Sequence, residues 1–100
     1  MDSMETGMDA ATLKIALEVV SDMIRKARGD IDVQCIHRVA RKAVSSKRIC
    51  ILEVAKVPAR CPTKSGYATL LSVGNSHDDK VVYVLHYVNR RVKVERLLNQ

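Results

Sequence analysis

A change in the spacing of apolar residues near Lys47 constrains the fold of this chain more than any other feature. Before Lys47, apolar residues recur every three or four positions, which is the period of an amphipathic helix. After it, β-branched residues gather in short runs that end at Pro, Gly or Asn, which is typical of strands and turns. The order predicts an α+β fold, with an N-terminal αα-hairpin followed by a three- or four-stranded, mainly antiparallel sheet.

The length of 100 residues is that of one domain. Residues 1–8 show no apolar period, and we expect them to form a disordered N-terminus before a single α+β domain over residues 9–100. The core should be aliphatic, because the chain has no Phe or Trp. No apolar run approaches the length of a membrane span and no secretory signal is seen, so we expect no membrane partner and a cytoplasmic or nuclear location.

The first helix is predicted over residues 10–28, capped by Asp9 at its start and by Gly29 after its end. Ile15 and Val19 widen its apolar arc beyond a simple stripe. An arc this broad favours cover from a second copy of the chain, so we expect a homodimer.

The second helix is predicted from residue 31 or 33 to residue 45 or 46, with Asp30 or Asp32 as its N-cap. At about 100° per residue, its two faces differ in character. The apolar arc comprises Val33, Ile36, Val39, Ala40, Ala43 and Val44, and the opposite arc comprises His37, Arg38, Arg41 and Lys42.

Four β segments are expected after Lys47, over residues 48–57, 67–73, 80–88 and 91–98. The third is apolar on both faces, which is typical of a central strand. Asn89 and Arg90 have the spacing of a two-residue hairpin turn leading to the last strand. The last segment could instead begin a terminal helix, and the sequence leaves both readings open.

Positive charge concentrates in the middle of the chain. The net charge is +6, yet residues 33–77 contain eight Lys or Arg against Glu53 as their single acid. A solvated surface normally mixes both signs, so this bias favours an anionic partner. The predicted binding residues for nucleic acid lie on the second helix and in the basic segments after it: His37, Arg38, Arg41, Lys42, Lys47, Arg48, Arg60 and Lys64.

Cys35, His37, Cys50 and Cys61 lack the paired spacing of a structural zinc site. We therefore expect no metal, with the thiols acting as small core residues. His77 with its two neighbouring aspartates is predicted to form a solvated turn, and His86 to pack or pair within the sheet. No acid–base pair suited to catalysis emerges, so neither an enzyme nor a cofactor is expected.

These observations predict a small basic nucleic-acid-binding protein that contacts mainly phosphates, with RNA, duplex included, slightly favoured over DNA. The charge layout would suit a small viral or regulatory protein. The alternative is a non-catalytic protein-interaction module or dimeric adaptor whose basic face binds an acidic protein partner.

Overall fold

The computed structural model describes residues 10–28, 30–45, 49–58 and 67–97. Two helices precede four strands: α1 (Ala10–Lys26), α2 (Val33–Ala43), β1 (Cys50–Pro58), β2 (Tyr67–Ser76), β3 (Asp79–Val88) and β4 (Arg91–Leu97). All neighbouring strands pair antiparallel, in the order β1-β2-β3-β4. The predicted α+β fold is confirmed in its four-stranded form, and a terminal helix over residues 91–98 is the wrong alternative. Within the described ranges, no helix is long and apolar enough to cross a membrane.

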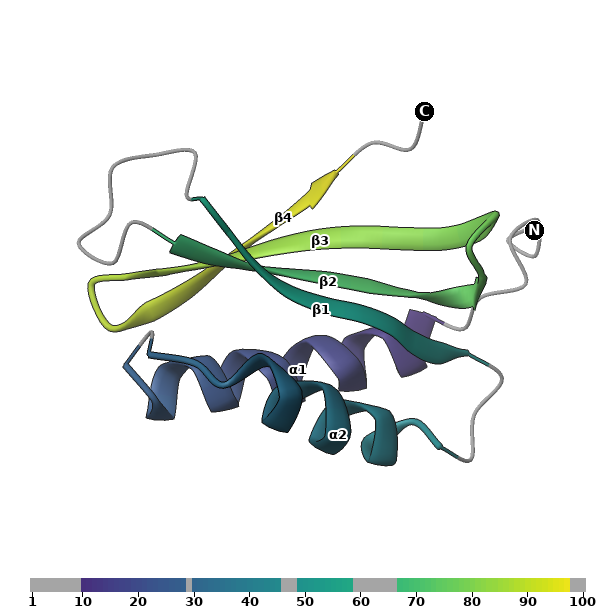
Figure 1. Cartoon of the computed structure of the whole chain (residues 1–100), viewed down its shortest axis with the longest axis horizontal. Helices are drawn as coiled ribbons and strands as arrows, with labels where there is room; N and C mark the ends of the chain where they lie inside the picture. The colour runs from purple at the N-terminus through teal and green to yellow at the C-terminus, as the bar shows by residue number, and fades with distance from the viewer. Residues whose placement is uncertain (1–9, 29, 46–48, 59–66, 98–100) are drawn as a thin grey trace.

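The helices form one layer and the sheet forms the other (Figure 1). Helix α2 packs against β1, α1 packs against β3 and β4, and the two helices contact each other. This arrangement leaves one long side of α2 turned away from the sheet. The αα-hairpin therefore acts as a single cover over one face of the sheet.

The core between the layers is built almost entirely from aliphatic side chains, as the sequence predicts. Its fully buried members come from both helices and from β1, β2 and β3, and Tyr83 is its one aromatic member among the buried residues described. Buried positions include Ala16, Val20, Ile24, Ile36, Ala40, Leu71, Val73, Val81 and Leu85.

Helix α1 ends two residues earlier than predicted, at Lys26. Arg28 has a φ of 55°, which lies in the left-handed region, so the helix cannot continue through it. The backbone N–H of Arg28 donates to the carbonyl of Arg25 in the last turn. The predicted caps Asp9 and Gly29 lie outside the described residues.

Helix α2 begins as the sequence predicts, because Asp32 is its N-cap. Its carboxylate accepts hydrogen bonds from the backbone N–H groups of Gln34 and Cys35, at 3.1 and 3.2 Å. Ile36 and Ala40 are fully buried, but Val39, which the helical period places on the same apolar arc, is 39% exposed and does not pack in the core. Val39 lies at the edge of the apolar arc, to one side of the buried residues Ile36 and Ala40.

The hairpin turns differ in how well the sequence predicts them. The turn between β2 and β3 is shorter than expected, since the strands extend to Ser76 and start again at Asp79. Between β3 and β4, Asn89 and Arg90 have φ values of 52° and 66°, as a type I′ turn requires. Strand β3 lies between β2 and β4, which confirms its predicted central position.

Candidate nucleic-acid interface

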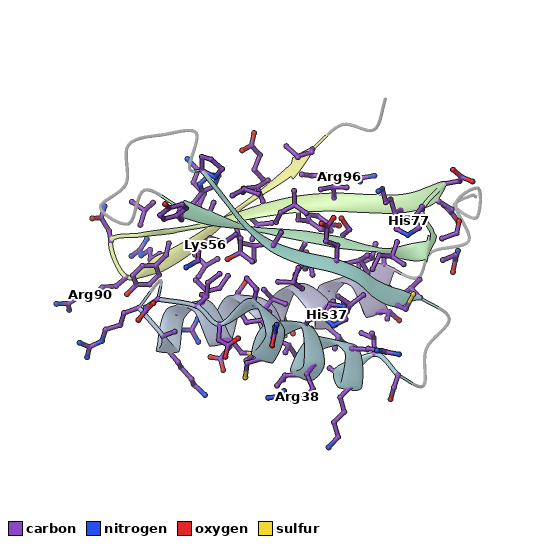
Figure 2. The ribbon with its side chains drawn as sticks, viewed as in Figure 1. His37, Arg38, Lys56, His77, Arg90 and Arg96 are labelled. Carbon is purple, nitrogen blue, oxygen red and sulfur yellow. The ribbon has the colours of Figure 1, made fainter. Side chains whose placement is uncertain are left out.

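The outer side of α2 carries three exposed cations, Arg38, Arg41 and Lys42, which we call the α2 cations. Because Ile36 and Ala40 bury the opposite side, the helical period directs these side chains to solvent. Figure 2 shows Arg38 on the side of α2 that faces away from the sheet. The helix contains no Asp or Glu. The α2 cations therefore form a surface of a single sign.

His37, also predicted to bind, is half-buried. It lies at the border between the packed and the solvated sides of α2, one step around the helix from Ile36. His37 is therefore less exposed than the α2 cations and does not lie on the same surface. The four other predicted residues, Lys47, Arg48, Arg60 and Lys64, lie outside the described residues, so only the part of the site on α2 is placed.

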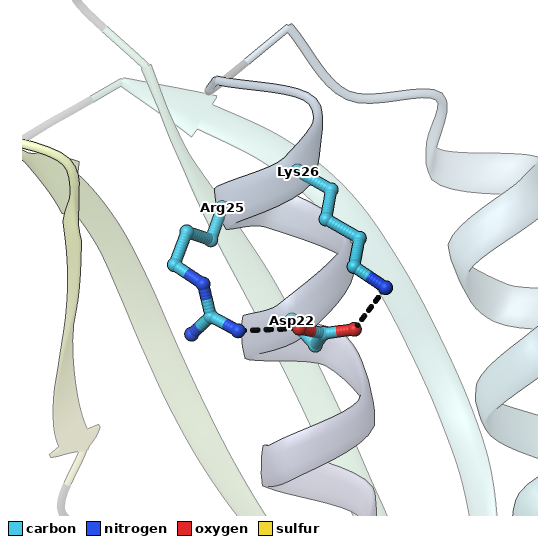
Figure 3. Close-up of polar contacts among 3 residues, drawn as sticks. All are labelled: Asp22, Arg25 and Lys26. Atoms are coloured by element: carbon cyan, nitrogen blue, oxygen red, sulfur yellow. Dashed lines mark hydrogen bonds and ion pairs between the residues drawn. The ribbon is translucent and has the colours of Figure 1, made fainter.

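The cations near the end of α1 have a different environment. Asp22 forms ion pairs with Arg25 and with Lys26, whose Nζ lies 3.0 Å from a carboxylate oxygen (Figure 3). The hydrogen bond from Lys26, together with the positive charge of Arg25, holds the pKa of Asp22 below its ordinary value of 3.8. Within the described part of the chain, no such ion pair is seen for the α2 cations. Their charges are therefore available to an external anion.

A basic pocket that the sequence did not predict lies where α1 ends and the β3–β4 turn begins. It has a volume of about 440 Å³ and is lined by Arg25, Arg28, Tyr87 and Arg90. Sequence reasoning missed it because no local period brings the end of α1 and the end of β3 together. The one local signal was the position of Tyr87 just before the predicted Asn89-Arg90 turn.

The cysteines differ from expectation. Cys50 is exposed at the start of β1, where its thiol donates to the carbonyl of Gly74 at 3.4 Å, and Cys35 is half-buried. The prediction that these thiols are small core residues is wrong, because both lie near the ends of elements and not at their packed centres. Cys61 lies outside the described residues. No group of three or more metal-ligating side chains occurs among the residues that the structure places.

The histidines of the sheet lie as predicted. His77 and Asp78 are exposed in the β2–β3 turn. His86 is buried in β3, and its Nε2 lies 3.6 Å from a carboxylate oxygen of Glu95 on the paired strand. This is a contact within the sheet, and it does not open onto any of the pockets described here.

No protein-family model, curated protein or solved structure matches this chain.

Proposed function

We propose that the protein binds nucleic acid by contacting phosphates with the α2 cations. The observation that carries the proposal is the row of three exposed cations on a helix that contains no acid. Acids elsewhere neutralise part of the positive charge of the chain, as Asp22 does on α1. On α2 that compensation is missing, which favours a polyanionic partner.

The geometry of α2 suits a phosphate backbone. Arg38 lies three and four residues before Arg41 and Lys42, so these side chains are neighbours on the helix surface. Their positions rise by about 4.5 and 6 Å along the axis. Arginine guanidinium groups can donate two parallel hydrogen bonds to phosphate oxygens. Because the buried side of α2 packs against the rest of the protein, the backbone that carries the α2 cations is already ordered. Less conformational entropy is therefore lost on binding.

RNA, duplex included, is the preferred ligand in this proposal. In the DNA major groove, Arg or Lys reads the edge of guanine, and Asn or Gln reads the edge of adenine. Helix α2 supplies one such amide, at Gln34. The contacts proposed here instead read the backbone, which carries no sequence information.

A second candidate function is that of a protein-interaction module whose basic face, the same α2 surface, binds an acidic partner. A groove of about 640 Å³ between α1 and β4 favours it. Leu17, Val19 and Val94 give this groove apolar walls, and Val94 is 42% exposed. Apolar surface of this kind is more typical of protein contacts than of phosphate contacts.

The test is a titration of single-stranded and duplex RNA and DNA at several salt concentrations, followed by fluorescence anisotropy. The variant changes Arg38, Arg41 and Lys42 to Ala. Each lost phosphate contact lowers the slope of log affinity against log salt by roughly 0.7 to 0.9, so the slope should flatten by about 2 to 3. The reduction should be similar for all sequences.

The matched control changes three exposed cations of other elements, Lys14, Lys93 and Arg96, to Ala. It removes the same formal charge, so an unchanged slope in the control assigns the contacts to α2. If the α2 variant is folded by circular dichroism and binds as the wild type does, α2 is not the binding face. If the wild type binds no nucleic acid at physiological salt, the acidic protein partner becomes the leading candidate.

A further inference from the structure

The basic pocket lies at one end of the molecule, apart from the α2 cations. Figure 2 shows Arg90 at that end, while Arg38 lies on the side of α2 that faces away from the sheet. The walls of the pocket are formed by Arg25 in the last turn of α1, Arg28 two residues beyond the helix, Tyr87 near the end of β3 and Arg90 in the β3–β4 turn. A volume of about 440 Å³ lies within the range of small-molecule sites.

Two of the three arginines in this pocket occupy backbone positions that L-residues with long side chains rarely adopt. Arg28 and Arg90 have φ values of 55° and 66°. Glycine or asparagine normally takes such positions, as Asn89 does here at 52°. The hairpin turn requires a positive φ at Arg90 but does not require arginine there, and residues held in strained conformations cluster at functional sites. Both strained arginines of the described chain line the same pocket.

The charges in the pocket are only partly compensated. Arg25 is paired with Asp22, whereas Arg28 and Arg90 form no ion pair with any residue that the structure describes. Two guanidinium groups are therefore free to take an anion. A terminal phosphate group suits these two side chains, because its oxygens can accept hydrogen bonds from both guanidinium groups.

Tyr87 adds an aromatic surface to this cationic pair. Its side chain is half-buried, packs against the core and also lines the pocket. A ring held in this way is a platform on which a planar base can stack. Guanidinium groups beside an aromatic ring are the combination that recognises a phosphate and its base together.

We propose that the basic pocket binds a nucleoside 5′-phosphate, with the phosphate on Arg28 and Arg90 and the base against Tyr87. The ligand is either a free nucleotide or the 5′ end of a strand, since both present the same group. The pocket and the α2 cations belong to different elements, so this site can exist whether or not α2 binds nucleic acid.

Calorimetric titrations of the full chain test the proposal. The probes are a nucleoside 5′-monophosphate, the matching nucleoside without phosphate, and inorganic phosphate. The nucleotide should bind, the nucleoside should not, and inorganic phosphate should bind at least about tenfold more weakly than the nucleotide. Inorganic phosphate binding as tightly as the nucleotide would overturn the assignment of Tyr87 to the base.

The variants are Arg28→Asn and Arg90→Asn, chosen because asparagine tolerates the left-handed backbone and keeps the fold. Either variant should weaken nucleotide binding about tenfold or more. Arg96→Asn, which removes an exposed arginine on β4 outside the pocket, is the control and should bind as the wild type does. Unchanged nucleotide affinity in both pocket variants would contradict the proposal.

A short RNA with and without a 5′-phosphate separates the two sources of ligand. In the Ala variant of the α2 cations, tighter binding of the phosphorylated strand than of the mononucleotide assigns the pocket to strand ends, and equal binding assigns it to the free nucleotide. Both outcomes support the site. The Ala variant of the α2 cations should retain nucleotide binding. That variant tests the α2 interface, and the Arg28 and Arg90 variants test the pocket, so the failure of one proposal can be distinguished from the failure of the other.

Discussion

Gly74 and Lys80 pair across β2 and β3 so closely that a Cβ atom on Gly74 would lie 2.5 Å from the Cα of Lys80. The same Cβ would lie 2.2 Å from the carbonyl oxygen of Asp79. Both neighbours are backbone atoms, so neither can move without shifting the strand. The ladder is also irregular between Gly74 and Ser76. The close approach of the two strands at this point therefore requires a residue without a side chain.

Gly74→Ala is expected to lower the free energy of unfolding by about 1 to 3 kcal/mol, the usual cost of forcing extra volume into a packed site. Urea denaturation followed by circular dichroism measures the change. Ser76→Ala, at an exposed position near the same turn, is the control and should stay within about 0.5 kcal/mol of the wild type. Equal stability of the two variants would contradict the close approach.

Asp32→Ala should destabilise the protein by about 1 kcal/mol, because it removes the acceptor for two backbone N–H groups of α2. Asp30→Ala is the matched control, since Asp30 is an exposed acid in the same link and is not the cap of α2. Thermal unfolding of both variants should show the larger loss for Asp32. If the losses are equal, the effect is one of net charge and not of capping.

Arg90→Gly should raise the free energy of unfolding by up to about 1 kcal/mol, because glycine adopts a positive φ without the steric cost that Arg90 bears. Arg91→Gly should have the opposite sign, since Arg91 begins β4, where glycine weakens a strand. Denaturant titrations of the two neighbouring variants give the comparison. A loss of stability in Arg90→Gly would show that its side chain contributes to folding.

Asp22 should make a small contribution to stability that depends on pH. Its pKa in the folded state is lowered by Lys26 and Arg25, so the contribution is present above the ordinary value of 3.8. It is lost as the pH falls through the lowered pKa of the folded state. The melting temperature of Asp22→Asn should therefore lie below that of the wild type at neutral pH, and the difference should close in acid.

Glu18→Gln, at an exposed acid of the same helix, should show a smaller difference at neutral pH. Because Asp22 and its partners are largely exposed, the difference for Asp22→Asn should also shrink in high salt. A difference that persists unchanged from neutral to strongly acidic pH would show that the ion pairs are not its cause.

Self-association through α1 remains a prediction. Ile15 and Val19 are half-buried, and Val19 shares a groove with the exposed Val94. Sedimentation at micromolar concentration should give a dimer, and Val94→Asp should weaken it. Val39→Asp is the matched control, because Val39 is a similarly exposed valine on α2. A wild-type monomer of 11.2 kDa would rule the dimer out.

The order of the elements could be predicted because each is encoded locally. The apolar period identifies α1 and α2, and the β-branched runs identify the strands. The turn at Asn89 and Arg90 could be predicted from its spacing and from the tolerance of asparagine for positive φ. The exposed positions on α2 follow from the same period, so three of the predicted binding residues could be placed on one surface.

Other features depend on tertiary contacts that a local pattern does not contain. The period gives the direction of Val39 around α2 but not the width of the contact that covers the helix. The sequence predicts that Gly29 caps the end of the first helix, yet the residue before it, Arg28, has a left-handed backbone. The basic pocket joins residues of α1 to residues of β3 and the following turn, so only the folded chain brings them together.

The meander order leaves β1 and β4 as the two edges of the sheet. An exposed edge is a template on which strands of other molecules can add, and proteins counter this with charges, prolines and bulges. Four of the seven residues of β4 are charged, and β1 has a register irregularity near its start and ends at Pro58. The edges are therefore poor seeds for fibrous aggregation, which should keep this basic protein dispersed at concentrations where a plain four-stranded sheet would polymerise.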